Sequence, residues 1–173
     1  IEFSDWSSDV CSSDLSLFVT SITPQGAKIM MTFFLECLSF FTDSNHLDAC
    51  LELISCQINK DMAAYRTSFI SNNGVSKVVT LAMDTEVVQL RSRVCDILLS
   101  LIYTGDDVAV WKCSESINFA VECLRSCMGD EVMCDKACRI LHALAKMDRT
   151  TRSKVRAVVV KDPCLAFFKS RIF

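Results

Sequence analysis

The 173-residue chain is poor in the residues that interrupt regular structure, with only 4 glycines and 2 prolines. The scarcity of glycine and proline excludes a collagen-like chain, and the scarcity of glycine excludes a Gly/Ser linker. A disordered chain is excluded too, because 51% of the residues are hydrophobic and can form a core. The most apolar stretch, residues 29–41, contains Glu36 and is shorter than the about 20 residues of a membrane span. We therefore expect a fully buried helix there, and no membrane partner.

The sequence also lacks a catalytic constellation. Its 2 histidines, His46 and His142, stand in no order with Ser, Asp or Cys that suggests nucleophilic catalysis. The few glycines are too scattered to form a phosphate-binding loop, and no HExxH metalloprotease motif occurs. We predict no catalytic residues, no enzyme activity in this chain and no cofactor.

The first fifteen residues read as a translated sequencing adapter, with the match running over residues 5–15. We interpret residues 1–15 as a non-native tail and exclude them from reasoning about the fold. Their removal changes the formal net charge from −3 to +1, because four acidic residues leave and no basic one does (Glu2, Asp5, Asp9 and Asp14). A nearly neutral body gives no reason to expect a nucleic-acid or membrane partner.

Helical periodicity runs through almost all of the remaining chain, and no segment alternates over the length of a strand. Three apolar segments, residues 49–58, 94–102 and 137–145, can be laid over one another with offsets of 44 and 43 residues. The alignment places Leu51 with Cys95 and Cys138, and Ile54 with Leu98 and Leu141. A period of about 40–47 residues is typical of helical solenoid repeats.

Residues 69–79 carry an apolar pair, a short polar stretch, Gly74 and a Val-rich helix, and a charged turn follows at residues 85–88. This pattern resembles the armadillo repeat, and the resemblance covers about residues 25–173. It implies an all-α fold, a right-handed α-solenoid of armadillo-like three-helix repeats, with HEAT-like repeats as the runner-up. It also implies a sharp corner at Gly74, where we expect a positive φ.

The repeat boundaries follow from the same alignment. We expect a partial repeat at 16–59, full repeats at about 60–103 and 104–146, and a partial repeat at 147–173. A repeat of this kind cannot cover its own apolar face, so about three or more are needed for stability. The chain is therefore expected to be a fragment, truncated at both ends.

In armadillo proteins the third helices line a groove that takes extended peptides. The resemblance implies a non-catalytic interaction scaffold with a protein or peptide partner on that surface. The positions that correspond to the Trp and Asn ladders of the nuclear-import adaptors are Glu52, Asp96 and Arg139, and Cys56, Ser100 and Ala143. None of them carries Trp or Asn, so a receptor for nuclear-localisation signals is not expected.

The repeat style also resembles the C-terminal repeat region of plant U-box ubiquitin ligases, through the ten cysteines after residue 15, the irregular repeat lengths and the run at residues 152–160. The alternative function is therefore the substrate-recognition region of such a ligase, with the E2 enzyme bound by a U-box elsewhere in the parent protein.

Ten cysteines remain after residue 15, and most lie inside apolar periodic runs. Without a visible secretory signal, they indicate a reducing compartment, the cytoplasm or the nucleus. Two cysteine pairs and a histidine form a candidate zinc or redox module: Cys123, Cys127, Cys134, Cys138 and His142. A spacing of four residues is also what a buried helical stripe produces, and free cysteine packs as a small apolar residue. We favour core packing and predict no metal.

Charge is unevenly distributed, since residues 146–171 carry eight basic and two acidic residues. Such a segment is either a solvated rim or a patch for an acidic peptide or a phosphate. Aromatic residues do not alternate with these bases, so a nucleic-acid partner is not expected.

Overall fold

The computed structural model describes residues 23–59, 63–113 and 115–173. The interpretation of residues 1–15 as an adapter lies outside these ranges. Within them every regular element is a helix, which confirms the predicted all-α class. In chain order these are α2 (Pro24–Phe40), α3 (Ser44–Asn59), α4 (Ala63–Ser71), α5 (Gly74–Met83), α6 (Val88–Tyr103), α7 (Asp107–Lys112), α8 (Glu115–Ser126), α9 (Glu131–Met147), α10 (Arg149–Lys161), the 3₁₀ helix η1 (Pro163–Phe168) and α11 (Lys169–Ile172).

Aspartates begin the C-terminal helices. The carboxylate of Asp130 accepts a hydrogen bond from the Met133 backbone N–H at 3.0 Å and caps α9. Asp148 does the same for α10 through Thr151 N at 2.8 Å, and Asp162 for η1 through Cys164 N at 2.9 Å. Each cap satisfies a backbone donor that the first helical turn leaves without a partner.

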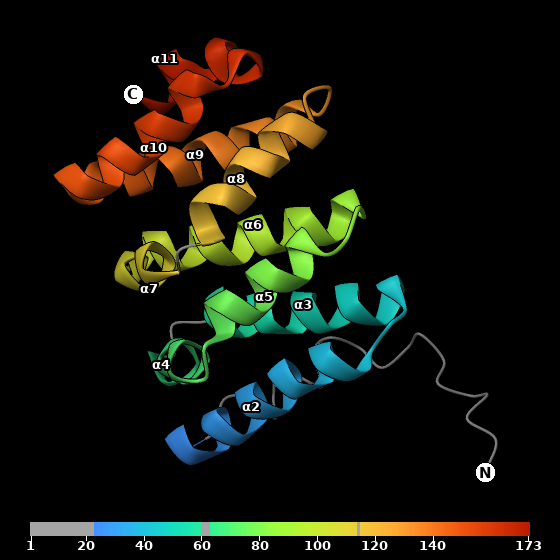
Figure 1. The fold of residues 1–173 in the computed structure, drawn as a ribbon. Coiled ribbons are helices and arrows are strands. Elements are labelled where there is room, and N and C mark those ends of the chain that lie inside the picture. The colour runs from blue at the N-terminus through green and yellow to red at the C-terminus, as the bar shows by residue number, and fades with distance from the viewer. Residues whose placement is uncertain (1–22, 60–62, 114) are drawn as a thin grey trace.

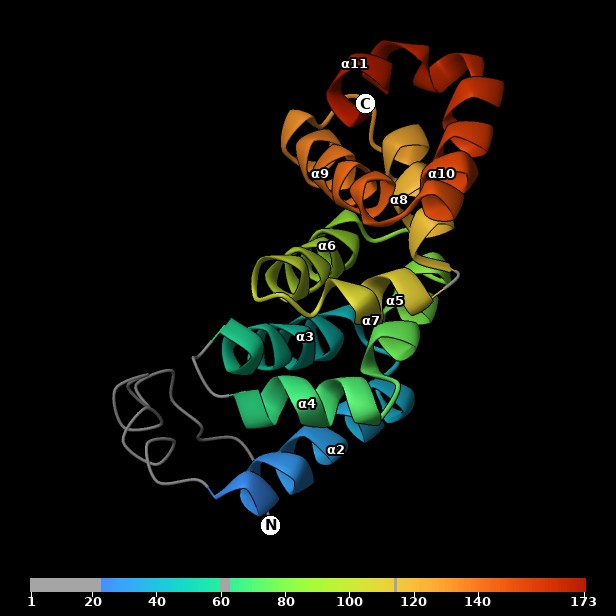
Figure 2. The same cartoon turned by 90° about the vertical axis from the view of Figure 1, so that its left-hand side faces the viewer.

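The helices follow one another along the long axis of the molecule, from α2 at one end to α11 at the other (Figure 1). The three segments aligned in the sequence become α3, α6 and α9. Helix α3 packs on α6 and α6 packs on α9, and Figure 2 shows them stacked along one side. On the other side α5 contacts both α2 and α8.

The core runs through this stack. Residues at aligned positions of α3, α6 and α9 are buried alike, with Leu51, Cys95, Cys138, Ile54, Leu98 and Leu141 all 2% exposed or less. These aligned core positions therefore point into the interior of the stack, because residues on one stripe of a helix all face the same side of it.

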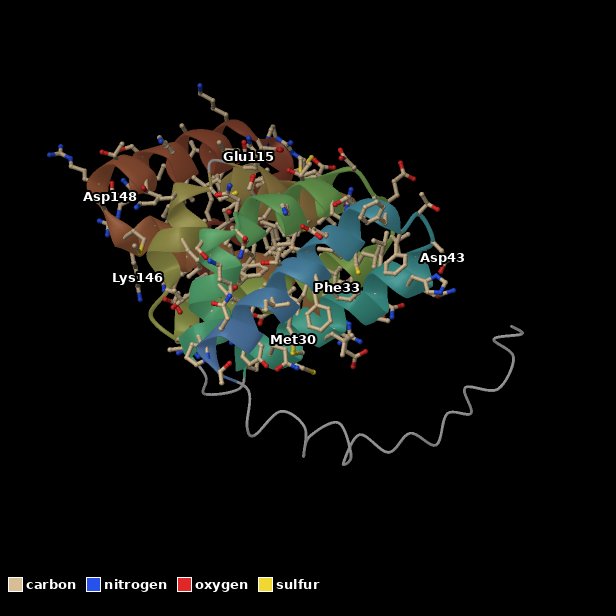
Figure 3. All side chains as sticks on the ribbon, turned by 90° about the horizontal axis from the view of Figure 1, so that it is seen from below. Met30, Phe33, Asp43, Glu115, Lys146 and Asp148 are labelled. Carbon is tan, nitrogen blue, oxygen red and sulfur yellow. The ribbon has the colours of Figure 1, made fainter. Side chains whose placement is uncertain are left out.

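Helix α2 differs from the expectation of a fully buried helix over residues 29–41. One stripe, including Met31 and Leu35, is buried, but Ile29 and Phe33 are each 61% exposed and Phe40 is 80% exposed. The reason is its place at the end of the stack, where α3, α4 and α5 pack on one side of it. Figure 3 views this end, with Phe33 and Met30 of α2 labelled on it. Among the described residues, no helix combines the length and apolar character that crossing a membrane would require.

The corner before α5 also differs from the prediction. Gly74 has no positive φ; the left-handed residue is its neighbour Asn73, with a φ of 56°. Asparagine tolerates this conformation because its short polar side chain can bond locally. Gly74 is instead the first residue of α5, and a Cβ placed there would lie 2.5 Å from ring atoms of Phe69. The position therefore requires glycine for its small size and not for its backbone freedom.

Arg91 of α6 is a charged side chain held inside the stack, only 7% exposed. Its Nε donates to the carbonyl oxygens of Ala82 at 3.2 Å and Thr85 at 2.9 Å, and its Nη1 donates to Ser126 Oγ at 2.6 Å. The guanidinium thus closes the C-terminal end of α5, where helix carbonyls lack partners and cations are favoured.

We expect Arg91→Leu to lower the free energy of unfolding by about 3 kcal/mol, because it leaves buried carbonyls without a donor. Chemical denaturation measures the change. The control is Arg149→Leu, since Arg149 is exposed on α10, and its effect should stay within about 0.5 kcal/mol. Equal effects of the two substitutions would show that Arg91 is not a structural link.

Candidate binding surface

The six positions predicted to bind a partner lie on three helices that pack in a row. Glu52 and Cys56 belong to α3, Asp96 and Ser100 to α6, and Arg139 and Ala143 to α9. All six side chains are exposed or half-buried, and the side chains of Glu52, Asp96 and Arg139 are 54%, 40% and 52% accessible. The structure therefore brings them onto one set of adjoining helices.

Two basic residues cross between these helices. Arg93 of α6 reaches back to α3, where it pairs with Asp48 at 3.0 Å and Glu52 at 3.2 Å. The hydrogen bond to Asp48 is the main reason that the pKa of Arg93 is raised. One helix further, Lys136 of α9 pairs with Asp96 of α6 at 2.8 Å, and it also donates to Ser92 Oγ at 2.8 Å.

Arg139 makes a different contact. Its Nε donates to the Tyr103 hydroxyl at 2.8 Å, and its guanidinium carbon lies 5.3 Å from the centroid of the Tyr103 ring. The same hydroxyl bond raises the pKa of Arg139. Tyr103 is 63% exposed. Tyrosine and arginine, with tryptophan, are enriched among the residues that contribute most of the binding energy at protein interfaces.

Arg93 and Lys136 are not among the positions predicted from the sequence, although the sequence carries a signal for them. They are 43 residues apart, as are Ser92 and Asp135, and Asp48 lies 44 residues before Ser92. A basic residue that directly follows a polar one, and recurs at the same offset as the core residues, lies at corresponding places on neighbouring helices and can bridge them.

The ion pairs determine which charges the surface offers to a ligand. Glu52 and Asp96 each already pair with a basic neighbour, and Arg93 is shared between Glu52 and Asp48. Exposed pairs of this kind contribute only about 0–1 kcal/mol, so a ligand can exchange them at small cost. Cys56, Ser100 and Ala143 are small, and Ser100 Oγ is turned onto the Asp96 carbonyl of its own helix at 2.8 Å. The surface thus combines small side chains with charged side chains that are already paired.

The candidate metal or redox residues do not converge. Cys123, Cys127, Cys134 and Cys138 are buried. Cys134 donates its thiol to the Cys127 carbonyl at 3.2 Å, while His142 Nδ1 lies 2.9 Å from the Ile172 carbonyl oxygen. Across residues 23–59, 63–113 and 115–173, no group of three or more His, Cys, Asp or Glu side chains is arranged to hold a metal ion.

The protonation of these thiols supports the core-packing interpretation. Burial raises the pKa of the Cys138 thiol to about 11, and burial with the nearby Cys37 raises the pKa of Cys50 to about 11. A hydrogen bond with Cys123, together with burial, raises the pKa of Cys95 well above its usual value. Metal binding and redox reactivity use the thiolate, which these environments disfavour.

The raised thiol pKa values predict a loss of stability at alkaline pH. In the unfolded chain these thiols ionise near their ordinary pKa of 9.0, while the folded protein keeps Cys50 and Cys138 protonated up to about pH 11. Their contribution is therefore fully present below pH 9 and decreases as the pH rises from 9 to 11.

The test is urea unfolding under reducing conditions between pH 8 and 10.5, for the wild-type chain and for a Cys50→Ala, Cys138→Ala double variant. The double variant should show the shallower decline of stability with pH. Parallel pH profiles would contradict the assigned burial of these thiols.

Comparisons with protein-family models, with curated proteins and with solved structures found no match to this chain.

Proposed function

We propose that this chain is a stretch of right-handed α-solenoid built from armadillo-like three-helix repeats, and that it acts as a non-catalytic scaffold. Its partner, a peptide or a protein segment, would lie along α3, α6 and α9. The observation that carries the proposal is the row of helices 43 and 44 residues apart, in which the aligned core residues Leu51, Cys95 and Cys138, and Ile54, Leu98 and Leu141, are buried alike. A repeated surface of this kind suits an extended ligand, because each helix offers equivalent positions to successive residues of the ligand.

The helix order supports the repeat boundaries. Helices α4, α5 and α6 fall within 60–103, and α7 and α8 fall within 104–146 followed by α9, which ends at Met147. Helices α2 and α3 precede them as a middle and a third helix, and α10, η1 and α11 follow as a first and a middle helix. HEAT-like repeats remain the alternative assignment for the same helices.

The experiment is selection of binding peptides from a random display library on the purified chain. A binder should lose its affinity for Ala143→Trp, because the larger side chain fills the surface between α6 and α9. The matched control is Ala157→Trp, at an exposed position of α10, which should leave binding unchanged. Binders that are insensitive to Ala143→Trp, with both variants equally stable, would refute the surface.

A role as the substrate-recognition region of a U-box ubiquitin ligase stays a prediction. It rests on the resemblance alone and requires a U-box in the parent reading frame. A full-length transcript that encodes no U-box would end it.

A further inference from the structure

A small basic pocket lies at the C-terminal end of α9. Its volume is about 180 Å³, and it is lined by His142, Ala145, Lys146, Arg152, Arg156, Ile172 and Phe173. The lining comes from α9, α10 and the end of the chain. It contains three cationic side chains and a histidine but no Asp or Glu, unlike the paired charges between α3, α6 and α9.

Neutral groups contact three of the pocket's side chains, those of Arg152, Arg156 and His142. Arg152 Nε donates to the Ala145 carbonyl at 2.9 Å. The guanidinium carbon of Arg156 lies 5.3 Å from the centroid of the Phe173 ring. His142 Nδ1 lies 2.9 Å from the Ile172 carbonyl oxygen, and because a carbonyl only accepts, Nδ1 carries the hydrogen. These contacts orient the side chains without neutralising their charge.

Several cations outside the pocket are paired with carboxylates, whereas, among the residues that the structure describes, those of the pocket are not. Arg66, Arg93, Arg125, Lys136, Arg139 and Arg171 each pair with a carboxylate. Within the described part of the chain, Lys146, Arg152 and Arg156 form no such pair. The pocket therefore keeps three positive charges available, and arginine presents a planar donor fork that matches the oxygens of phosphate.

We propose that this pocket binds the phosphate group of a phosphorylated side chain on a protein partner. A phosphomonoester carries a charge of about −1.5 to −2 and three acceptor oxygens, whereas a carboxylate carries a single charge. Three cations from two helices suit the higher charge. The small pocket favours a single phosphate on a peptide over a membrane, which is recognised by broader clusters of about 4–8 basic residues.

The site is separate from the six third-helix positions, but it adjoins them. His142 and Lys146 follow Arg139 on α9 at spacings of three and seven residues, which places them on one face of the helix. Figure 3 shows Lys146 at the edge of the stack, near Asp148. A ligand that lies along α9 can therefore reach both sites. Binding to the pocket is measured by itself, with no ligand on the surface formed by α3, α6 and α9.

The probe is a fluorescein-labelled peptide, Gly-Ser-phosphoserine-Ser-Gly, compared with its unphosphorylated form by anisotropy and by ¹⁵N NMR of the full chain. We expect the phosphopeptide to bind at least about tenfold more tightly and to shift the signals of His142, Lys146 and Arg156. Inorganic phosphate should compete with it. Equal affinities for the two peptides, or shifts confined to other helices, would overturn the proposal.

Arg156→Gln is the decisive variant, since Arg152 also closes the end of α9 and its loss would disturb folding. We expect Arg156→Gln to weaken phosphopeptide binding about fivefold to tenfold, and Lys146→Gln to do the same. The matched control is Lys154→Gln, which removes an exposed charge from α10 outside the pocket. It should change affinity less than about twofold, as screened long-range attraction predicts.

If all three charge variants weaken binding equally, the effect is net charge and the pocket is not a site. The membrane alternative is tested with phosphatidylcholine vesicles with and without phosphatidylinositol phosphate. Vesicle binding that depends on Arg156, without phosphopeptide binding, would replace the proposal by a lipid-headgroup site. Neither result depends on the third-helix surface, so a failure here is distinguishable from a failure of the proposed scaffold.

Discussion

Gly74→Val is expected to lower the free energy of unfolding by about 3 kcal/mol or more. A Cβ at this position would lie 2.5 Å from two ring atoms of Phe69, and Phe69 is fully buried. The ring cannot retreat without displacing its neighbours, because protein interiors are close-packed. Overpacking of this kind typically costs about 1–3 kcal/mol, and valine adds two further carbons at the point of contact.

The measurement is the urea unfolding midpoint of Gly74→Val beside that of Gly74→Ala, which should show a smaller loss of the same sign. Gly129→Ala is the control, because nothing lies within 4 Å of a Cβ at that glycine. Combining Gly74→Ala with Phe69→Leu should recover part of the loss, since the smaller side chain removes the clash. Additive losses in that double variant would show that the two residues do not meet.

Leu98→Ala is expected to cost about 2–5 kcal/mol, the usual range for a buried leucine that leaves a cavity behind. Leu98 is fully buried on α6, the helix that lies between α3 and α9. Its loss removes apolar contacts at the centre of the stack. Because α3 and α9 pack on α6 from both sides, the neighbouring helices cannot move far enough to fill the cavity. Thermal or chemical denaturation measures the effect.

A second leucine provides the control. Leu53 on α3 aligns with the fully buried Ile97 of α6, yet it is 44% exposed. We expect Leu53→Ala to cost about 1 kcal/mol or less, because little apolar area leaves the interior. A wild-type-like unfolding curve for Leu98→Ala, or a larger loss for Leu53→Ala, would refute the placement of these helices.

The exposure of Leu53 shows that the repeat alignment predicts the burial of some aligned residues but not of all. The offset of 44 residues correctly places Ile54 and Leu98 in the core, but it does not predict that Leu53 is exposed while Ile97 is buried. A period reports that helices recur, whereas the exposure of one residue depends on what each neighbouring helix covers. Helix α2 makes the same point, because its apolar length predicted burial and its place at the end of the stack leaves Phe33 and Phe40 exposed.

The candidate binding surface was also predictable only in part. The positions of Glu52, Asp96 and Arg139 on neighbouring helices followed from their spacing. Their ion pairs with Arg93 and Lys136, and the bond from Arg139 to Tyr103, join residues 36 to 41 positions apart. Such contacts depend on how the side chains of packed helices are oriented toward one another, and a single sequence gives little information about that.

The sequence by itself determined the all-helical class and the recurrence of its long helices, because helical periodicity and N-capping aspartates act within a few residues. It also indicated the basic character of residues 146–171. Only the tertiary structure decided which of those bases remain unpaired. Arg156 meets Phe173 and His142 meets Ile172 because the end of the chain packs on α9, and charge compensation depends on that packing.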